Sequence, residues 1–247
     1  MGTRHLITIV KDGEFKLAQY GQWDGYPSGQ GAEILKFLSE GDMEALRRNV
    51  DNLYYIGEEE AEELYEVAAG IPKGQEWINM EQSDSLKANL PTLHRDTGAK
   101  ILELLAAGGG NTIPGRDDDD VRIPTVNMLS FAGGWDCEWA YTIDLDKDTF
   151  EIYKAGSNRR LRNRFTDVID NAYKDAEDKP CFVKLVGEYK FDALPTFEEF
   201  LEEQEPGALE RHREWMARRA AAEAEEQGDT LSDENAPDDD GKPSLSM

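Results

Sequence analysis

The sequence predicts an α+β protein: a mostly antiparallel sheet from two hairpins, packed with helices and followed by a disordered acidic C-terminal tail. Three observations lead to this prediction. Two pairs of β-rich runs are each separated by a short turn, helical periodicity fills the stretches between and after them, and the last 28 residues contain almost no large apolar side chains. We expect a single domain at residues 1–205, a charged helix at 206–219 and the disordered tail at 220–247.

Strands are expected where β-branched and aromatic residues gather in short runs bounded by turn residues. The first turn contains Asp12-Gly13, a pair typical of tight hairpins. In the second hairpin, apolar residues alternate with others from Cys137 onward, as in a strand with one buried face. The expected strands are Leu6–Val10, Phe15–Tyr20, Cys137–Leu145, Thr149–Lys154 and Cys181–Val186.

Helices are expected where apolar residues recur at spacings of three and four. Ser28 and Asp96 are suitable N-caps, and glycines at 41 and 108–110 are suitable stops. Residues 111–123 are expected to form a loop, and no element is predicted for residues 70–90. The expected helices are Ser28–Leu38, Asp42–Ile56, Glu58–Ala69, Asp96–Ala107, Arg162–Tyr173 and Thr196–Glu203.

The charge of the chain excludes several classes of partner. There are 27 Lys and Arg against 52 Asp and Glu, a formal net charge of −25. The tail has nine acidic residues and one lysine, which still leaves −17 on residues 1–219. Because binding to nucleic acid or to anionic lipid requires a basic face, we expect no direct nucleic-acid binding and no membrane binding.

Targeting and redox signals are sparse. The N-terminal residues lack the basic, apolar and small-residue succession of a signal peptide, and no apolar run approaches the length of a membrane helix. With only Cys137 and Cys181, no disulfide framework is implied. We therefore expect a cytoplasmic protein, and no motif calls for a cofactor.

The densest group of candidate site residues lies between the second strand and the first helix, at residues 19–31. Its glycines allow backbone N–H groups to approach an anion, its aromatic residues offer flat apolar surfaces, and its amides could fix a polar ligand. The alternative is a purely structural strand-to-helix connection. If the protein is a hydrolase, Asp24 is the expected general base. The expected ligand-binding residues are Gln19, Gln22, Trp23, Tyr26, Ser28, Gly29 and Gln30, with Arg4, Glu138 and Trp139 as second walls.

Three stretches carry a family resemblance. Residues 1–6 (Met-Gly-Thr-Arg-His-Leu), the Trp-Asp-Gly-Tyr-Pro motif within residues 18–31, and the strand at 137–145 resemble a family of uncharacterised fungal, bacterial and phage proteins. The resemblance covers roughly residues 1–40 and 125–155. It implies a microbial or phage origin and points to the 19–31 loop, but it brings no known activity.

A second and more distant resemblance is to the N-terminal-nucleophile hydrolases. A first strand, a hairpin and a polar loop follow one another in a similar order, and in that class the free N-terminal residue is both nucleophile and base. Here Thr3 could serve only after removal of Met1 and Gly2.

Three further groups have both a chemical and a structural interpretation. Cys137 could be a nucleophile if His5 or His94 lay beside it, or a small buried apolar residue. Asp117–Asp120 could gather a hard cation with Asn111, although a solvated loop is the simpler interpretation, and we expect no metal site. Arg159–Arg164, with four arginines, could hold phosphate or balance the acidic helices.

Two functions from different classes remain open. The leading hypothesis is a protein that binds a small molecule or peptide at residues 19–31, with hydrolysis as an added possibility. The alternative is a non-enzymatic acidic interaction protein or inhibitor that acts on a basic surface of a host partner protein.

Overall fold

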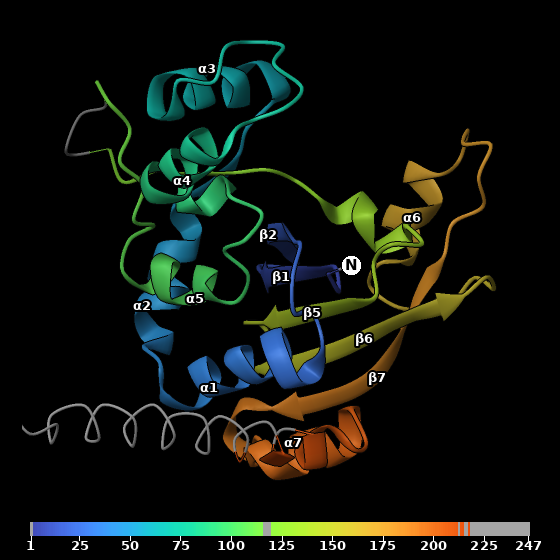
Figure 1. Cartoon of the computed structure of the whole chain (residues 1–247). Coiled ribbons are helices and arrows are strands. Elements are labelled where there is room, and N and C mark those ends of the chain that lie inside the picture. The colour runs from blue at the N-terminus through green and yellow to red at the C-terminus, as the bar shows by residue number, and fades with distance from the viewer. Residues whose placement is uncertain (1, 116–119, 212, 215–216, 218–247) are drawn as a thin grey trace, which may run out of the picture. The chain divides into compact units, whose positions relative to one another are not determined.

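The computed structural model describes residues 2–115, 120–211, 213, 214 and 217 (Figure 1). Contacts between residues group Met1–Glu205 in one compact unit and Pro206–Met247 in a second. In the second unit, the described residues 208–211, 213, 214 and 217 are helical. The predicted tail at 220–247 lies outside the described residues.

A five-stranded mixed sheet forms the centre of the first unit, in the strand order β2-β1-β5-β6-β7 within the described chain. The hairpins β1–β2 and β5–β6 lie side by side through the parallel pairing of β1 with β5, and β7 adds an antiparallel edge. The sheet confirms the predicted α+β fold. Its strands are β1 (His5–Lys11), β2 (Glu14–Gly21), β5 (Trp139–Asp144), β6 (Thr149–Ser157) and β7 (Phe182–Lys190).

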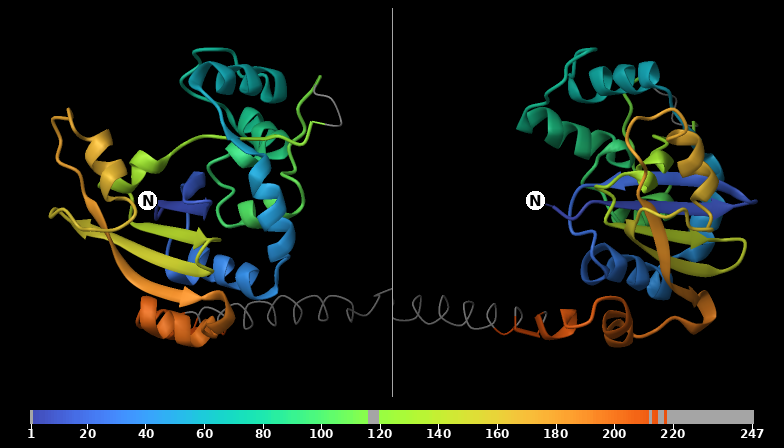
Figure 2. Two further views of the ribbon diagram at one scale, coloured as in Figure 1. Left: turned by 180° about the vertical axis from the view of Figure 1, so that it is seen from behind. Right: turned by 90° about the vertical axis from the view of Figure 1, so that its right-hand side faces the viewer.

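Helices cover both faces of this sheet because alternate strand residues are apolar on each side. On one face, α1 (Ala32–Glu40) and α7 (Phe197–Gln204) pack on the sheet (Figures 1 and 2). There the Phe150 ring stacks between Tyr141 and Phe200, with centroid distances of 6.1 and 6.0 Å. On the other face, the residues next to α6 (Thr166–Ala172) close a second core around Tyr153 and Phe165, whose ring centroids are 5.0 Å apart.

The remaining elements lie between the two hairpins in the sequence. A small apolar cluster of Ala68, Ile71, Leu86 and Leu90 joins α3 to α4. Figures 1 and 2 show this helix pair lying away from β5, β6 and β7. The elements are α2 (Met43–Asn49), β3 (Leu53–Tyr55), α3 (Glu58–Ala69), α4 (Met80–Asn89), α5 (Lys100–Ala106) and β4 (Ile123–Thr125).

Four of the predicted helices differ from the structure by three or more residues at one end. The helix predicted at Arg162–Tyr173 begins only at Thr166, because residues 163–165 form a turn, and the helix predicted at Ser28–Leu38 begins at Ala32. The helix predicted at Asp42–Ile56 ends at Asn49, because Leu53–Tyr55 turns into β3 and pairs in parallel with β4. The helix predicted from Asp96 begins only at Lys100, because Gly98 has a φ of +53° and interrupts the helical backbone. Helix α4 lies in the region for which no element was predicted. Its N-terminus has a reciprocal capping box between Asn79 and Gln82.

Among the described residues, none of the helices has the length and apolarity needed to cross a membrane.

Candidate functional site

The three glutamines of the 19–31 loop are engaged within the protein: the side chains of Gln19 and Gln30 bond to backbone, and the side chain of Gln22 bonds to another side chain. The Gln19 side chain is buried, and its Nε2 donates to the His94 carbonyl at 3.4 Å. The Gln22 backbone N–H donates to the Arg95 carbonyl at 3.2 Å, while the Gln22 Oε1 accepts from the Tyr20 hydroxyl. The Gln30 Oε1 accepts from the Ala99 N–H at 2.6 Å, and so satisfies a free donor at the start of α5. These contacts tie the loop to residues 94–99.

The backbone donors of this loop are also engaged. Residues Pro27–Gly31 form a single π-helical turn in which the N–H groups of Gly29 and Gly31 donate to the Tyr26 carbonyl. Gly29 lies so close to Asp24 that a Cβ would be 2.3 Å from the Asp24 carbonyl oxygen. The prediction that Ser28 caps the first helix is wrong: α1 begins at Ala32 without a side-chain cap, and the Ser28 N–H donates to Glu205 Oε2 at 3.0 Å.

Four residues of the loop are exposed, among them Ser28. We call the other three the Trp23–Asp24–Tyr26 ridge. Trp23 is 48% and Tyr26 45% exposed, and Asp24 is exposed as well. Asp24 has a φ of +55°, a left-handed conformation that few residues other than glycine adopt. Within the described chain, its carboxylate has no hydrogen-bond or ion-pair partner. Asp24 as a general base stays a prediction.

The residues proposed as second walls separate into two groups. Arg4 pairs with Asp136 at 2.5 Å, and its carbonyl accepts the N–H of the exposed Glu138 at 3.1 Å. Trp139, by contrast, is only 4% exposed. It stacks on Tyr141 and carries the Lys154 ammonium 5.0 Å from its ring centroid. Its indole therefore belongs to the sheet and offers little surface to a ligand.

His5 lies beneath the loop and is almost completely buried. A Cβ at Gly21 would be 2.2 Å from the imidazole ring, so the missing side chain makes room for it. Neither ring nitrogen has a hydrogen-bond partner in the described structure. Burial lowers the pKa of His5 to about 4, and the nearby Thr3 backbone opposes this only in part. His5 is therefore neutral at pH 7.

The candidate thiol nucleophile is buried too. Cys137 has no exposed surface, its Sγ lies 3.5 Å from the Trp139 carbonyl, and burial raises the pKa of the thiol. A protonated and inaccessible thiol is a poor nucleophile. Thr3, the residue that an N-terminal nucleophile would require, is likewise buried.

A Ser–His pair that the sequence did not suggest lies next to the loop. Ser83 Oγ is 3.2 Å from His94 Nε2, and His94 Nδ1 accepts the Asp96 N–H at 3.2 Å. Burial lowers the pKa of His94, which favours the neutral ring. Because Nδ1 accepts the Asp96 N–H, the single proton of the neutral ring is on Nε2. The imidazole therefore donates to Ser83. A general base would have to accept the serine proton, so this pair supports the structure rather than acyl transfer.

No family, curated protein or solved structure matches this chain. The resemblance carried by residues 1–40 and 125–155 stays a prediction.

Metal ligands do not gather in the part of the chain that the structure describes: no three His, Cys, Asp or Glu side chains lie close enough together to hold an ion. Residues 117–119 of the acidic run lie outside that part.

The arginines at residues 159–164, predicted either to hold phosphate or to balance acidic helices, differ in what they contact. Arg160 balances acidic residues of α6, since it lies 2.6 Å from Asp170 and 3.6 Å from Asp167. Arg164 turns inward onto the sheet and pairs with buried carboxylates. Arg162 is exposed and has no ion pair among the described residues.

A surface that the sequence did not single out stands on the α3–α4 lobe, which we define as residues 58–89. Trp77 is 85% and Met80 81% exposed, and Ile78 between them is 41% exposed. The lobe has nine acidic and two basic residues, a net charge of −7. The sequence does contain a signal for this surface, because the apolar pair Trp77-Ile78 interrupts a stretch of acidic and amide residues. The local pattern alone does not tell whether this pair is buried or exposed.

Proposed function

We propose that this protein is a non-enzymatic interaction protein whose α3–α4 lobe docks on a basic, amphipathic surface of a partner protein. The observation that carries the proposal is the exposure of Trp77 and Met80. Large apolar side chains that protrude together from a polar surface are typical of protein interaction sites. Trp is also among the residues that most often dominate binding energy.

The charge of the lobe indicates the chemistry of the partner. Exposed apolar side chains surrounded by a net charge of −7 suit a surface that combines apolar residues with lysines and arginines. The field of the whole chain, with a net charge of −25, would speed the approach of such a partner.

Hydrogen bonds hold the loop that carries Trp77, and Met80 follows it at the start of α4. The Gln75 amide donates to the Trp77 carbonyl at 2.6 Å and to Gln82 Oε1 at 2.8 Å, and the Gln82 amide donates to the Gly70 carbonyl at 3.1 Å. Glu62 also accepts the Gly74 N–H at 3.1 Å. Because the loop is braced on both sides, Trp77 is presented with less ordering entropy left to lose on binding.

The test uses the full chain and a fluorescein-labelled helical peptide of leucine and lysine, with leucines at spacings of three and four. We expect binding by fluorescence anisotropy, weaker at raised salt. Replacing Trp77 and Met80 together by Ala should raise the Kd at least about tenfold, equivalent to about 1.4 kcal/mol. The matched control is Trp135→Ala, which removes a Trp that is 63% exposed outside the lobe. If the lobe variant binds the peptide like the wild type, the proposal is wrong.

A second candidate is the Trp23–Asp24–Tyr26 ridge, which could bind a peptide or small molecule as the sequence suggested. The favouring observation is the left-handed Asp24, because backbone strain often accompanies a functional constraint. The same titration separates the two candidates. If Trp23→Ala loses peptide binding and the variant with Trp77 and Met80 replaced keeps it, the binding site is the ridge.

A further inference from the structure

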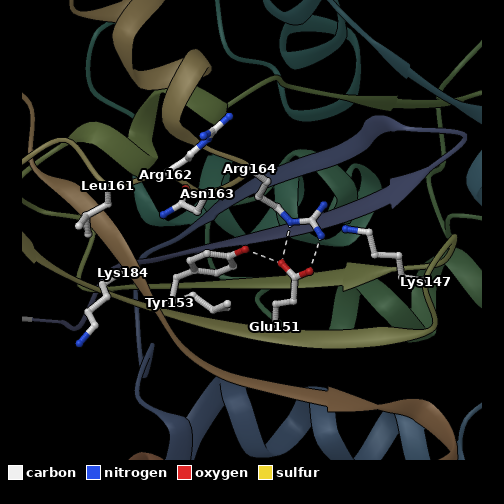
Figure 3. Close-up of a pocket in the computed structure, with 9 residues that line it drawn as sticks. Lys147, Glu151, Tyr153, Leu161, Arg162, Asn163, Arg164 and Lys184 are labelled. Atoms are coloured by element: carbon white, nitrogen blue, oxygen red, sulfur yellow. Dashed lines mark hydrogen bonds and ion pairs between the residues drawn. The ribbon is translucent and has the colours of Figure 1, made fainter.

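A polar recess of about 550 Å³ opens on the α6 side of the sheet. Glu151 and Tyr153 of β6 form its floor, and the segment before α6 contributes Arg162 and Arg164 (Figure 3). Its volume lies within the range of small-molecule sites. Of its nine lining residues, four are cationic and only Glu151 is acidic, in a chain where acidic residues outnumber basic ones about two to one. The recess therefore concentrates positive charge against the composition of the chain.

A buried network holds Arg164 in place. Its Nε and Nη2 donate to both oxygens of Glu151, and Nη2 also donates to Asp144 Oδ2 at 2.6 Å. The Tyr153 hydroxyl donates to Glu151 as well. Asp144 is 2% and Glu151 4% exposed. Burial alone would raise the pKa of Asp144, but the hydrogen bonds from Arg164 and the Lys147 backbone outweigh burial and hold it below its ordinary value.

The segment that carries Arg164 is itself anchored to the sheet. The Asn163 amide donates to the Val183 carbonyl of β7 at 2.7 Å, and Asn163 Oδ1 accepts the Phe165 N–H at 2.9 Å. The guanidinium is therefore fixed by its ion pairs on one side and by its backbone on the other. Rigid placement of this kind is what a binding site requires.

Several cationic donors of the recess remain available. Within the described chain, Arg164 Nη1 has no acceptor, and Arg162 and Lys184 have no ion-pair partner. The Lys147 ammonium points toward the Arg164 guanidinium, and its contact with Asp144 is long, at 3.7 Å (Figure 3). Arg162 and Lys184 extend outward at the rim (Figure 3).

We propose that this recess binds the phosphomonoester group of a small metabolite. A planar carboxylate is best matched by the two-pronged edge of a guanidinium, but Glu151 already occupies that edge of Arg164. The donors left over are separate points of charge: Nη1 of Arg164, the ammonium of Lys147 and the exposed side chain of Arg162. A tetrahedral dianion can accept from several such directions at once. The proposal is independent of the α3–α4 lobe.

The test is isothermal titration calorimetry of the full chain at low ionic strength with inorganic phosphate, ribose 5-phosphate and AMP. We expect all three to bind, because they share the phosphate group. The volume of the recess should decide the order of their affinities. Lys147→Ala and Arg162→Ala should each raise the Kd at least about tenfold, the effect of losing one charge-assisted contact. Both residues are exposed, so neither change should unfold the protein.

The matched control is Arg159→Ala, which removes the same charge from an exposed position of the same segment, outside the recess. It should leave the Kd within about twofold. A second readout is the ¹⁵N-resolved signal of the Arg164 Nε–H, which should shift with phosphate. Absence of binding by all three ligands, or equal weakening by Arg159→Ala and Arg162→Ala, would overturn the proposal.

Discussion

The buried His5 predicts a loss of stability in mild acid. Its pKa is lowered from 6.5 to about 4 in the folded protein, where neither ring nitrogen has a partner among the described residues. In the unfolded chain, the imidazole regains its ordinary pKa and takes up a proton more readily. The free energy of unfolding should therefore fall as the pH drops from about 6.5 toward 4, with the His5 contribution fully present above that window.

The size of this effect follows from the pKa difference. The fall in the pKa of His5 from 6.5 to about 4 corresponds to about 3 kcal/mol once the pH is below both values. At pH 5, the unfolded His5 is almost fully protonated while the folded one is mostly neutral, so about 2 kcal/mol is already lost. That is a large part of the stability of an ordinary domain.

The assay is urea unfolding of the wild type and of His5→Asn at pH 7 and pH 5. Asn is polar and does not titrate. Any destabilisation caused by its packing at position 5 is therefore the same at both pH values and cancels in the comparison. Carboxylates and His94 titrate in both proteins and cancel as well. The wild type should lose about 2 kcal/mol more than the variant between the two pH values. Equal losses would refute the assignment of a neutral, buried His5.

Two further predictions concern single backbone positions. Gly25→Ala should lower the free energy of unfolding by about 1–3 kcal/mol, because the new Cβ would lie 2.8 Å from the Thr3 carbonyl oxygen. The control is Gly57→Ala, where the new Cβ meets open space. It should change the free energy of unfolding by less than about 0.5 kcal/mol. Thr196→Ala should cost about 1 kcal/mol, because it removes the capping box with Glu199 at the start of α7, and Thr196→Ser should restore most of it. Both are checked by urea unfolding, and an unchanged midpoint in Gly25→Ala or Thr196→Ala would contradict the packing or the cap.

Most of the correctly predicted elements follow from turn residues and from the spacing of apolar residues along the chain. Asp12 and Gly13 both have positive φ, as the predicted tight hairpin requires. The alternation after Cys137 places Tyr141 on one face and Ala140 on the other, as the predicted strand does. Leu53–Tyr55 was misassigned because its apolar residues also continue a helical spacing. Its partner strand, β4, lies about 70 residues further along the chain.

The candidate site was harder to predict because an amide has the same sequence signature whether it binds a ligand or the protein's own backbone. Gln30 illustrates this: its acceptor role at Ala99 depends on a loop 69 residues away. Trp23 and Tyr26 are exposed, and their role as ligand-binding residues stays a prediction, whereas the exposed Trp77 was not singled out. Which charges meet at Arg164 is likewise decided by strand pairing rather than by neighbours in the sequence.

The parallel pairing of β1 with β5 has a consequence for the order in which the chain assembles. Thr8 and Thr142 share a 2.8 Å hydrogen bond although 134 positions separate them. On a translating ribosome, the first hairpin can form early, but its inner edge has no partner until the residues of β5 have emerged. Everything from α1 to β4 is synthesised in that interval. The nascent N-terminal hairpin therefore exposes an open strand edge while residues 22–138 are synthesised, a period in which chaperone engagement should be greatest.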